Sequence, residues 1–277
     1  MTTPFFLLTH LPAASYDKNI PSLFEVIAVM RVYVSGNTPR DAYLKCLLER
    51  EGHETPASGP WDAVFLSLPK SVLHPREAAQ LRKGQKIVCG NIESGLDELI
   101  KENNWKTYRI LEDERFAREN AELTAEGALY YAARQSDSAL RKSRCLVIGY
   151  GRIGRALTER LRALGACVTV AARREESRKE AGENSVGTDE IKGVLPEMDF
   201  VFSTAPALLL PEDGLRAARK SALLMELASP PYGIDLAAAR ALGLRVSLES
   251  GVPGRYCPRS AAQLILDYAK REGVFDA

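Results

Sequence analysis

Short apolar runs alternate with amphipathic stretches along most of the chain. In the first half, the runs predict strands at 31–35, 63–66, 86–89 and 108–111. The intervening stretches predict helices at 38–52, with Thr38 as the N-cap, and at 75–83 and 93–102. In the second half, the pattern predicts strands at 145–148, 167–171, 199–204, 222–227 and 244–248, with a final helix at 260–272. Strands that alternate with helices form parallel sheets covered on both faces, so the pattern predicts an α/β fold.

The run CLVIGYGRIG at residues 145–154 joins an apolar strand to a helical stretch through three glycines. Gly149 permits a tight turn, Gly151 lets a pyrophosphate approach bare backbone, and Gly154 lets the helix pack closely on the strand. The free N–H groups at the start of the helix then bind the anion. We interpret Gly149, Gly151, Arg152, Ile153 and Gly154 as a dinucleotide site of the Rossmann type; a glycine turn without a ligand is the alternative.

The end of the next strand, 167–171, indicates which dinucleotide binds. An NAD site usually has Asp or Glu about 20 residues after the glycines, where it accepts hydrogen bonds from the ribose 2′-OH. This chain has Ala172-Arg173-Arg174 there instead, and a guanidinium pairs with a 2′-phosphate that a carboxylate would repel. Arg173, supported by Arg174, therefore predicts NADP(H); a basic surface turn is the alternative.

A polar turn follows the strand at 199–204. Its residues are Ser203, Thr204, Ala205 and Pro206. In a Rossmann sheet this strand end lies beside the nicotinamide ribose, so we predict that the turn contacts the cofactor. An ordinary polar turn is the alternative.

These observations predict an α/β protein of two doubly wound parallel-sheet domains, the second a Rossmann NAD(P)-binding domain, linked by one or two long helices at 112–137. We expect an N-terminal flavodoxin-like substrate or partner domain at 1–120, a Rossmann NADP-binding domain at 121–259 and a C-terminal helix at 260–277. Residues 1–29 fit no clean element, and Met30 directly precedes the first convincing strand. A later natural start is therefore one expectation.

Composition narrows the class of protein. A chain of 277 residues with 45% hydrophobic content and a net charge of +1 is typical of a soluble globular protein with no general affinity for nucleic acid or membranes. Its five cysteines are widely spaced and include no CxxC pair, which predicts reduced thiols and no metal site. Cys145 and Cys167 are expected inside buried strands. No basic residue precedes the apolar segment at 4–8, so we expect no signal peptide and a cytoplasmic location.

Several motifs together resemble the family formed by the A subunit of dipicolinate synthase. They are TAEG (124–127), GYGRIG (149–154), AARR (171–174), STAPALLL (203–210), ELASPPYGID (226–235) and GVPGRYCPRSAAQLI (251–265). They cover most of residues 120–277, whereas the first half resembles the family only in the order of its strands and helices, with weak points of similarity at Ser35-Gly36 and Cys89-Gly90. The family segment ASRPGG reads Ala228-Ser229-Pro230-Pro231-Tyr232-Gly233 here and lacks the arginine.

The resemblance implies an NADP-dependent oxidoreductase that oxidises a dihydrodipicolinate-type precursor to dipicolinate by hydride transfer to NADP+. It also implies that the partner is a flavoprotein-like B subunit, and that the protein acts during sporulation in the mother cell of endospore-forming bacteria. We further expect a homo-oligomer.

Such a substrate has two carboxylates, which call for cationic anchors. Arg40 and Lys70 in the first domain, and Arg255 and Arg259 near the Gly- and Pro-dense loop at 251–258, are the candidates, with Tyr256 as a candidate proton relay. Each arginine and lysine has an alternative as a solvated surface charge, and the tyrosine as a packing residue. The catalytic acid or base stays unassigned.

The histidines weigh against one class of enzyme. Two-domain hydroxyacid dehydrogenases use a late histidine paired with a carboxylate, whereas this chain has only His10, His53 and His74, all in the first domain. Two alternatives remain: a reductase or dehydrogenase of another small dicarboxylate, and a non-catalytic NADP-binding regulatory subunit. The altered segment Ser229-Pro230-Pro231 and the missing histidine support the second.

Overall fold

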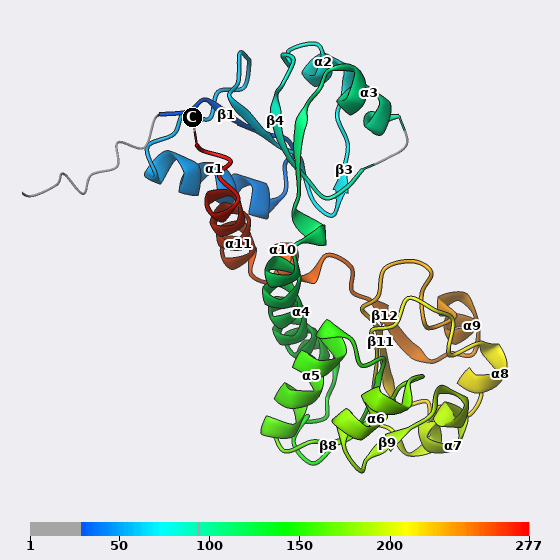
Figure 1. The fold of residues 1–277 in the computed structure, drawn as a ribbon. Coiled ribbons are helices and arrows are strands. Elements are labelled where there is room, and N and C mark those ends of the chain that lie inside the picture. The colour runs from blue at the N-terminus through cyan, green and yellow to red at the C-terminus, as the bar shows by residue number, and fades with distance from the viewer. Residues whose placement is uncertain (1–28, 93–94, 277) are drawn as a thin grey trace, which may run out of the picture.

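The computed structural model describes residues 29–92 and 95–276, and in it the chain forms two α/β domains joined by two helices (Figure 1). The predicted element-free segment 1–29 therefore lies outside the described residues, apart from Val29, as do His10 and the start of the helix predicted at 93–102. The main joining helix is α4 (Glu114–Gln135), which corresponds to the long helical segment predicted at 112–137. The domain boundary predicted at residue 120 falls within it.

The first domain contains a parallel sheet of four strands. They are β1 (Val32–Val34), β2 (Ala63–Phe65), β4 (Lys86–Cys89) and β6 (Lys106–Arg109), in the order β1-β2-β4-β6. On the outer side of β1, a single parallel bridge joins Arg31 to Glu54. Glu54 and β2 therefore lie on opposite sides of β1. The connection from β1 to β2 passes along one side of β1 before the chain crosses to the other side.

Helices cover both faces of this sheet. Helix α1 (Pro39–Arg50) begins after Thr38, whose hydroxyl accepts the N–H of Asp41, as the predicted N-cap requires. It packs Leu44 and Leu48 against one face, whereas α3 (Leu96–Glu102) packs Leu96 against the other. This arrangement is doubly wound, as predicted.

The second domain has a six-stranded parallel sheet in the order β12-β11-β10-β7-β8-β9. The strands are β7 (Arg144–Ile148), β8 (Cys167–Ala171), β9 (Ser185–Val186), β10 (Phe200–Ser203), β11 (Leu223–Glu226) and β12 (Arg245–Leu248). Counted along the chain, this is the order 3-2-1-4-5-6 of a Rossmann domain. The predicted fold class is confirmed, and the five predicted strands differ from those observed by one residue at most at each end.

The C-terminal part of the chain returns to the first domain. Helix α11 (Pro258–Arg271), predicted at 260–272, packs Ile265 and Leu266 against the buried residues of α1. The prediction of a loop at 251–258 is wrong, because residues Val252–Tyr256 form a short helix, α10. Pro253 lies in its first turn, where the missing N–H has no helical partner to lose.

Other differences concern short elements. The helix predicted at 75–83 ends early as α2 (Pro75–Ala78), and the strand predicted at 108–111 is β6 followed by a 3-10 turn at Ile110–Glu112. No bounds were predicted for the remaining short elements: β3 (Lys70–Ser71), β5 (Asn91–Ile92), β9, α6 (Glu175–Ala181), α7 (Ile191–Val194), α8 (Glu212–Leu215), α9 (Leu236–Ala241) and the 3-10 turns Thr188–Glu190 and Leu195–Glu197. None is long enough to display a helical period of apolar residues.

All five cysteines have free thiols in the structure. Cys145 is buried in β7 as expected, but the expectation for Cys167 is wrong, because it is the first residue of β8 and is exposed at the edge of the sheet. In the part of the chain that the structure describes, no helix is long and apolar enough to cross a membrane.

Candidate functional site

The glycine turn between β7 and α5 (Arg152–Ala163) has the geometry that a dinucleotide needs. Gly149 has φ +97°, a left-handed conformation that favours glycine. A Cβ on Gly154 would lie 2.1 Å from the Gly149 carbonyl oxygen, whereas a Cβ on Gly151 would meet no atom within 4 Å. The third glycine is thus required for helix packing, and the second leaves the start of α5 open to an anion.

A cavity of about 480 Å³ lies over this turn at the carboxyl edge of the sheet. It is lined by residues from the ends of β7, β8 and β10 and from the segments that follow β7, β8, β9 and β10: Gly149, Tyr150, Gly151, Ala171, Ala172, Arg173, Arg174, Ser177, Thr188, Thr204, Ala205, Pro206, Ala207 and Leu209. A second cavity of about 240 Å³, which also contains Gly151 and Thr204, extends toward α4. Most of the predicted cofactor residues therefore line the larger cavity.

The two predicted phosphate-binding arginines are exposed at its rim. Neither the Arg173 nor the Arg174 side chain forms an ion pair or a hydrogen bond with any residue in 29–92 or 95–276. Many other arginines of this domain are paired with carboxylates, Arg155 with Glu180 among them. Two adjacent unpaired guanidinium groups beside a cavity are the features that an anionic ligand requires.

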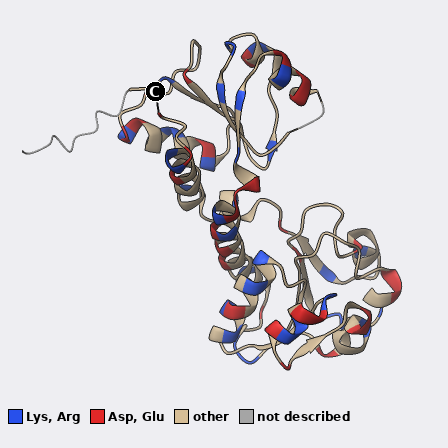
Figure 2. Ribbon diagram, in the orientation of Figure 1, with Lys and Arg blue, Asp and Glu red and all other residues tan. Residues whose placement is uncertain are grey.

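Four predicted cofactor residues do not line the main cavity: Arg152, Ile153, Gly154 and Ser203. Arg152, the first residue of α5, pairs with Glu114 of α4, and Ile153 lies with it in the smaller cavity. Figure 2 shows acidic and basic residues interspersed along both helices. Ser203 is fully buried at the end of β10, where a Cβ on Gly233 would come within 2.2 Å of its hydroxyl oxygen.

The candidate substrate anchors are not brought into a single cluster. Arg40 is only 9% exposed, so its alternative as a solvated surface charge is wrong. Its Nη2 donates to the Leu68 carbonyl at 2.5 Å, and its Nη1 would lie 3.5 Å from a Cβ on Gly254, so the side chain bridges the first domain and α10. Burial lowers the pKa of its guanidinium. Lys70 and Arg259 are exposed.

The two candidates from α10 contact α4. Arg255 pairs with the buried carboxylate of Glu249 at 3.1 Å and lies over the Tyr131 ring at 5.0 Å. The hydroxyl of Tyr256 donates to Glu126 at 3.1 Å, and burial is the main reason that its pKa is raised. These contacts hold α10 against α4. The anchoring role predicted for Arg255 and the proton-relay role predicted for Tyr256 stay predictions.

Sequence reasoning missed Glu226, which is completely buried at the end of β11. Its carboxylate accepts the N–H groups of Ala228 at 2.9 Å and Ile234 at 2.8 Å, and so fixes the loop that contains the altered Ser229-Pro230-Pro231 segment. The available signal was a glutamate that ends the apolar run of β11. A carboxylate buried in such a run needs backbone donors to be stable.

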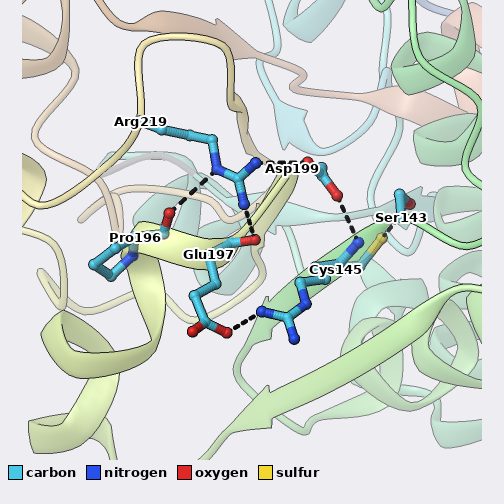
Figure 3. Close-up of polar contacts among 7 residues, drawn as sticks. Ser143, Cys145, Pro196, Glu197, Asp199 and Arg219 are labelled. Atoms are coloured by element: carbon cyan, nitrogen blue, oxygen red, sulfur yellow. Dashed lines mark hydrogen bonds and ion pairs between the residues drawn. The ribbon is translucent and has the colours of Figure 1, made fainter.

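A second polar cluster lies at the opposite, amino-terminal edge of the same sheet (Figure 3). Asp199 accepts the Arg144 N–H at 2.8 Å and the Arg219 Nη1 at 3.1 Å, and Arg219 also donates to the Pro196 carbonyl at 3.2 Å. Its groups are bonded to one another and lie far from the strand ends that bind ligands in such sheets. This cluster stabilises the edge of the sheet.

Comparison with known proteins agrees with this geometry. Residues 109–228 match the family model described as "D-isomer specific 2-hydroxyacid dehydrogenase, NAD binding domain". The A subunit of dipicolinate synthase from Bacillus subtilis (strain 168) is 29% identical over 182 residues, which make up 65% of this chain and 61% of the relative. The match therefore spans about three fifths of that relative's length.

Two solved structures have the same fold. The A subunit of dipicolinate synthase from Bacillus halodurans is similar with a TM-score of 0.78 and 21% identity, covering 89% of this chain and 98% of that one. The corresponding subunit from Bacillus subtilis has a TM-score of 0.75 and 22% identity, covering 88% of this chain and 96% of that one. Together the motifs, the fold and these matches confirm that the chain resembles the family of the dipicolinate synthase A subunit, and that it contains a dehydrogenase-type NAD(P)-binding domain.

Proposed function

We propose that this protein is an NADP-dependent oxidoreductase of the dipicolinate synthase type, which oxidises a dihydrodipicolinate-type dicarboxylate to dipicolinate. The observation that supports it most directly is the cavity between the glycine turn and two arginines whose side chains have no partner among the described residues. The chain is also 29% identical over 182 residues to the A subunit of dipicolinate synthase from Bacillus subtilis. The proposal places the protein in the cytoplasm of the mother cell of a sporulating bacterium. A flavoprotein-like B subunit is its proposed partner, and a homo-oligomer its proposed state.

The preference for NADP rests on the end of β8. Arg173 and Arg174 follow the strand at the position where NAD enzymes place a carboxylate, and the adjacent Glu175 and Glu176 are exposed in the first turn of α6. A 2′-phosphate carries close to two negative charges, so two adjacent guanidinium groups favour it over a neutral 2′-hydroxyl. We expect Arg173→Asp to weaken NADPH binding by about two orders of magnitude and NADH binding far less.

The chemistry is a dehydrogenation that forms an aromatic ring. The substrate ring loses a hydride to bound NADP+ and a proton to a base or to water, so no strong base is required of the protein. The protein's contribution is to hold the substrate beside the cofactor and to neutralise its two carboxylates. Arg40, Lys70, Arg255 and Arg259 are the proposed anchors, and Tyr256 the proposed proton relay.

The decisive experiment follows NADPH absorbance after the protein is mixed with NADP+ and freshly prepared dihydrodipicolinate, with and without a flavoprotein-like partner. Turnover in either mixture supports the proposal. If neither mixture shows turnover although calorimetry confirms that NADP binds, the synthase function is excluded.

Two observations favour a second candidate, a non-catalytic NADP-binding regulatory subunit. In the described part of the second domain there is no histidine, and the segment Ser229-Pro230-Pro231 lacks the family's arginine. A reductase of another small dicarboxylate is the third candidate. NADP binding without turnover favours the regulatory subunit, whereas NADPH-dependent reduction of a different dicarboxylate favours the reductase.

A further inference from the structure

We propose that Arg178 is a positioning residue for dinucleotide selectivity, which holds the turn after β8 so that Arg173 and Arg174 face the 2′-phosphate. This inference rests on the proposed preference for NADP. It assigns a role to a side chain that does not line the cavity.

Arg178 lies on α6 and its side chain turns back toward the start of that helix. Its Nη1 donates to two consecutive carbonyls, Ala172 O at 3.0 Å and Arg173 O at 2.9 Å. The residue is half-buried, whereas Arg173 and Arg174 are exposed. One guanidinium nitrogen thus fixes the orientation of two peptide groups at the point where β8 ends.

The backbone around Arg178 is itself well held. Its N–H donates to the Arg174 carbonyl at 3.2 Å, and its carbonyl accepts the Ser185 hydroxyl at 3.0 Å and the Gly182 N–H at 3.1 Å. The Arg178 backbone is therefore fixed by hydrogen bonds within α6 and to β9. Because the backbone is fixed, the guanidinium determines which way the two carbonyls point.

The orientation of these carbonyls matters because each oxygen bears a partial negative charge. Engaged by Arg178, they are directed toward a cation and not toward the cavity, so they do not repel a phosphate there. Hydrogen bonds from a charged donor are stronger than neutral ones, so the turn is held before any ligand arrives. Without Arg178, the turn would have to be ordered when NADP binds, which costs affinity.

A neutral 2′-hydroxyl makes little demand on this geometry, so the effect should appear in NADPH binding and not in NADH binding. A matched control is available at the other end of the same helix. Arg162 of α5 donates through Nη2 to the carbonyl of Ala181, the last residue of α6, at 2.7 Å. Like Arg178 it binds a backbone carbonyl, but Ala181 does not line the cavity, whereas Ala172 and Arg173 do.

The test measures dissociation constants of NADPH and NADH by calorimetry for the wild type, Arg178→Met, Arg178→Lys and Arg162→Met, with melting temperatures for each. Met keeps the aliphatic packing and removes the donors, whereas Lys keeps a cationic donor. We expect Arg178→Met to weaken NADPH about tenfold and NADH less than about twofold. Arg178→Lys should recover part of the loss, and Arg162→Met should leave the NADPH:NADH ratio unchanged.

Two results would overturn the inference: an equal loss for both dinucleotides in Arg178→Met, or the same change of ratio in Arg162→Met. If Arg178→Met does not fold, the comparison is made with Arg178→Gln, which removes the charged donor and keeps a polar side chain, and an unchanged NADPH:NADH ratio in that variant overturns the inference. Arg173→Asp separates this failure from that of the proposed function. If Arg173→Asp changes the NADPH:NADH ratio and the Arg178 variants do not, only the proposed role of Arg178 fails. If Arg173→Asp leaves the ratio unchanged, the proposed preference for NADP fails.

Discussion

The Nε of Arg152 lies 3.1 Å and 3.2 Å from the two carboxylate oxygens of Glu114, which joins the first turn of α5 to the first turn of α4. The same carboxylate accepts the Nε of Arg118 at 2.9 Å. These hydrogen bonds, first from Arg152 and then from Arg118, lower the pKa of Glu114 to about 2. The carboxylate is therefore charged throughout the neutral range and holds Arg152 beside the glycine turn.

We expect Glu114→Gln to strengthen dinucleotide binding. A pyrophosphate at the start of α5 competes with Glu114 for Arg152, so a weaker intramolecular partner favours the ligand. The gain should be about two- to fivefold, as for other exposed ion pairs, and equal for NADPH and NADH because both have a pyrophosphate. The control is Glu119→Gln, since Glu119 pairs with Arg115 on the same helix. An equal gain in the control would contradict the expectation.

Gly127, in the TAEG motif of α4, is required for the packing of α10. A Cβ at this position would lie 2.3 Å from Val252 Cγ1 and 3.0 Å from Tyr256 Cβ. We expect Gly127→Ala to lower the free energy of unfolding by about 1–3 kcal/mol, because α10 must move away from α4. The control is Gly193→Ala in α7, where a Cβ would meet nothing within 4 Å. Denaturant unfolding measures both, and an undiminished stability of Gly127→Ala would refute the packing argument.

Four of the five thiols fall into two classes of reactivity. Burial raises the pKa of Cys89 and of Cys145 to about 11, whereas Cys46 and Cys167 are exposed. At about pH 8 the buried thiols are almost entirely protonated, and only the thiolate reacts. We expect an alkylating reagent to label Cys46 and Cys167 in the native protein, and Cys89 and Cys145 only after unfolding, as mapped by mass spectrometry. Rapid native labelling of Cys145 would disagree with its position in β7.

Glu226→Gln should destabilise the second domain. The glutamine has a single acceptor oxygen for the two N–H groups of Ala228 and Ile234, so one buried donor is left unpaired, at a cost of about 1–3 kcal/mol. An exposed glutamate, Glu183, is the control position for the same substitution.

The effect of Glu226→Gln should also depend on pH. Burial is the main reason that the pKa of Glu226 is raised. A raised pKa in the folded state gives stability that is present below the unfolded value, about 4.3, and is lost as pH rises through the folded value. The advantage of the wild type over the variant should therefore shrink from about pH 4 to pH 8 in denaturant titrations. An advantage that grows with pH would contradict this.

The features predicted correctly from sequence depend on neighbours along the chain. The strand at 167–171 was apparent from a continuous apolar run, the N-cap at Thr38 from one hydroxyl before a helical period, and the tight turn at Gly149 from glycine spacing. The loop predicted at 251–258 was wrong because Gly and Pro are typical of loops. In the structure, residues Val252–Tyr256 form helix α10, which packs against Gly127 of α4. A local pattern contains no information about such a partner.

Periodicity and backbone conformational preference act within a few residues, so the amino-acid sequence was enough to predict the fold class, the glycine turn and the two arginines after β8. Burial and pairing depend on which distant segments pack together, and no local pattern contains that information. The structure was needed to show that Arg40 is buried between the first domain and α10, that Glu114 holds Arg152, and that Arg178 donates to the Arg173 carbonyl. In the part of the chain that the structure describes, the same packing leaves the side chains of Arg173 and Arg174 without a carboxylate partner at the rim of the cavity.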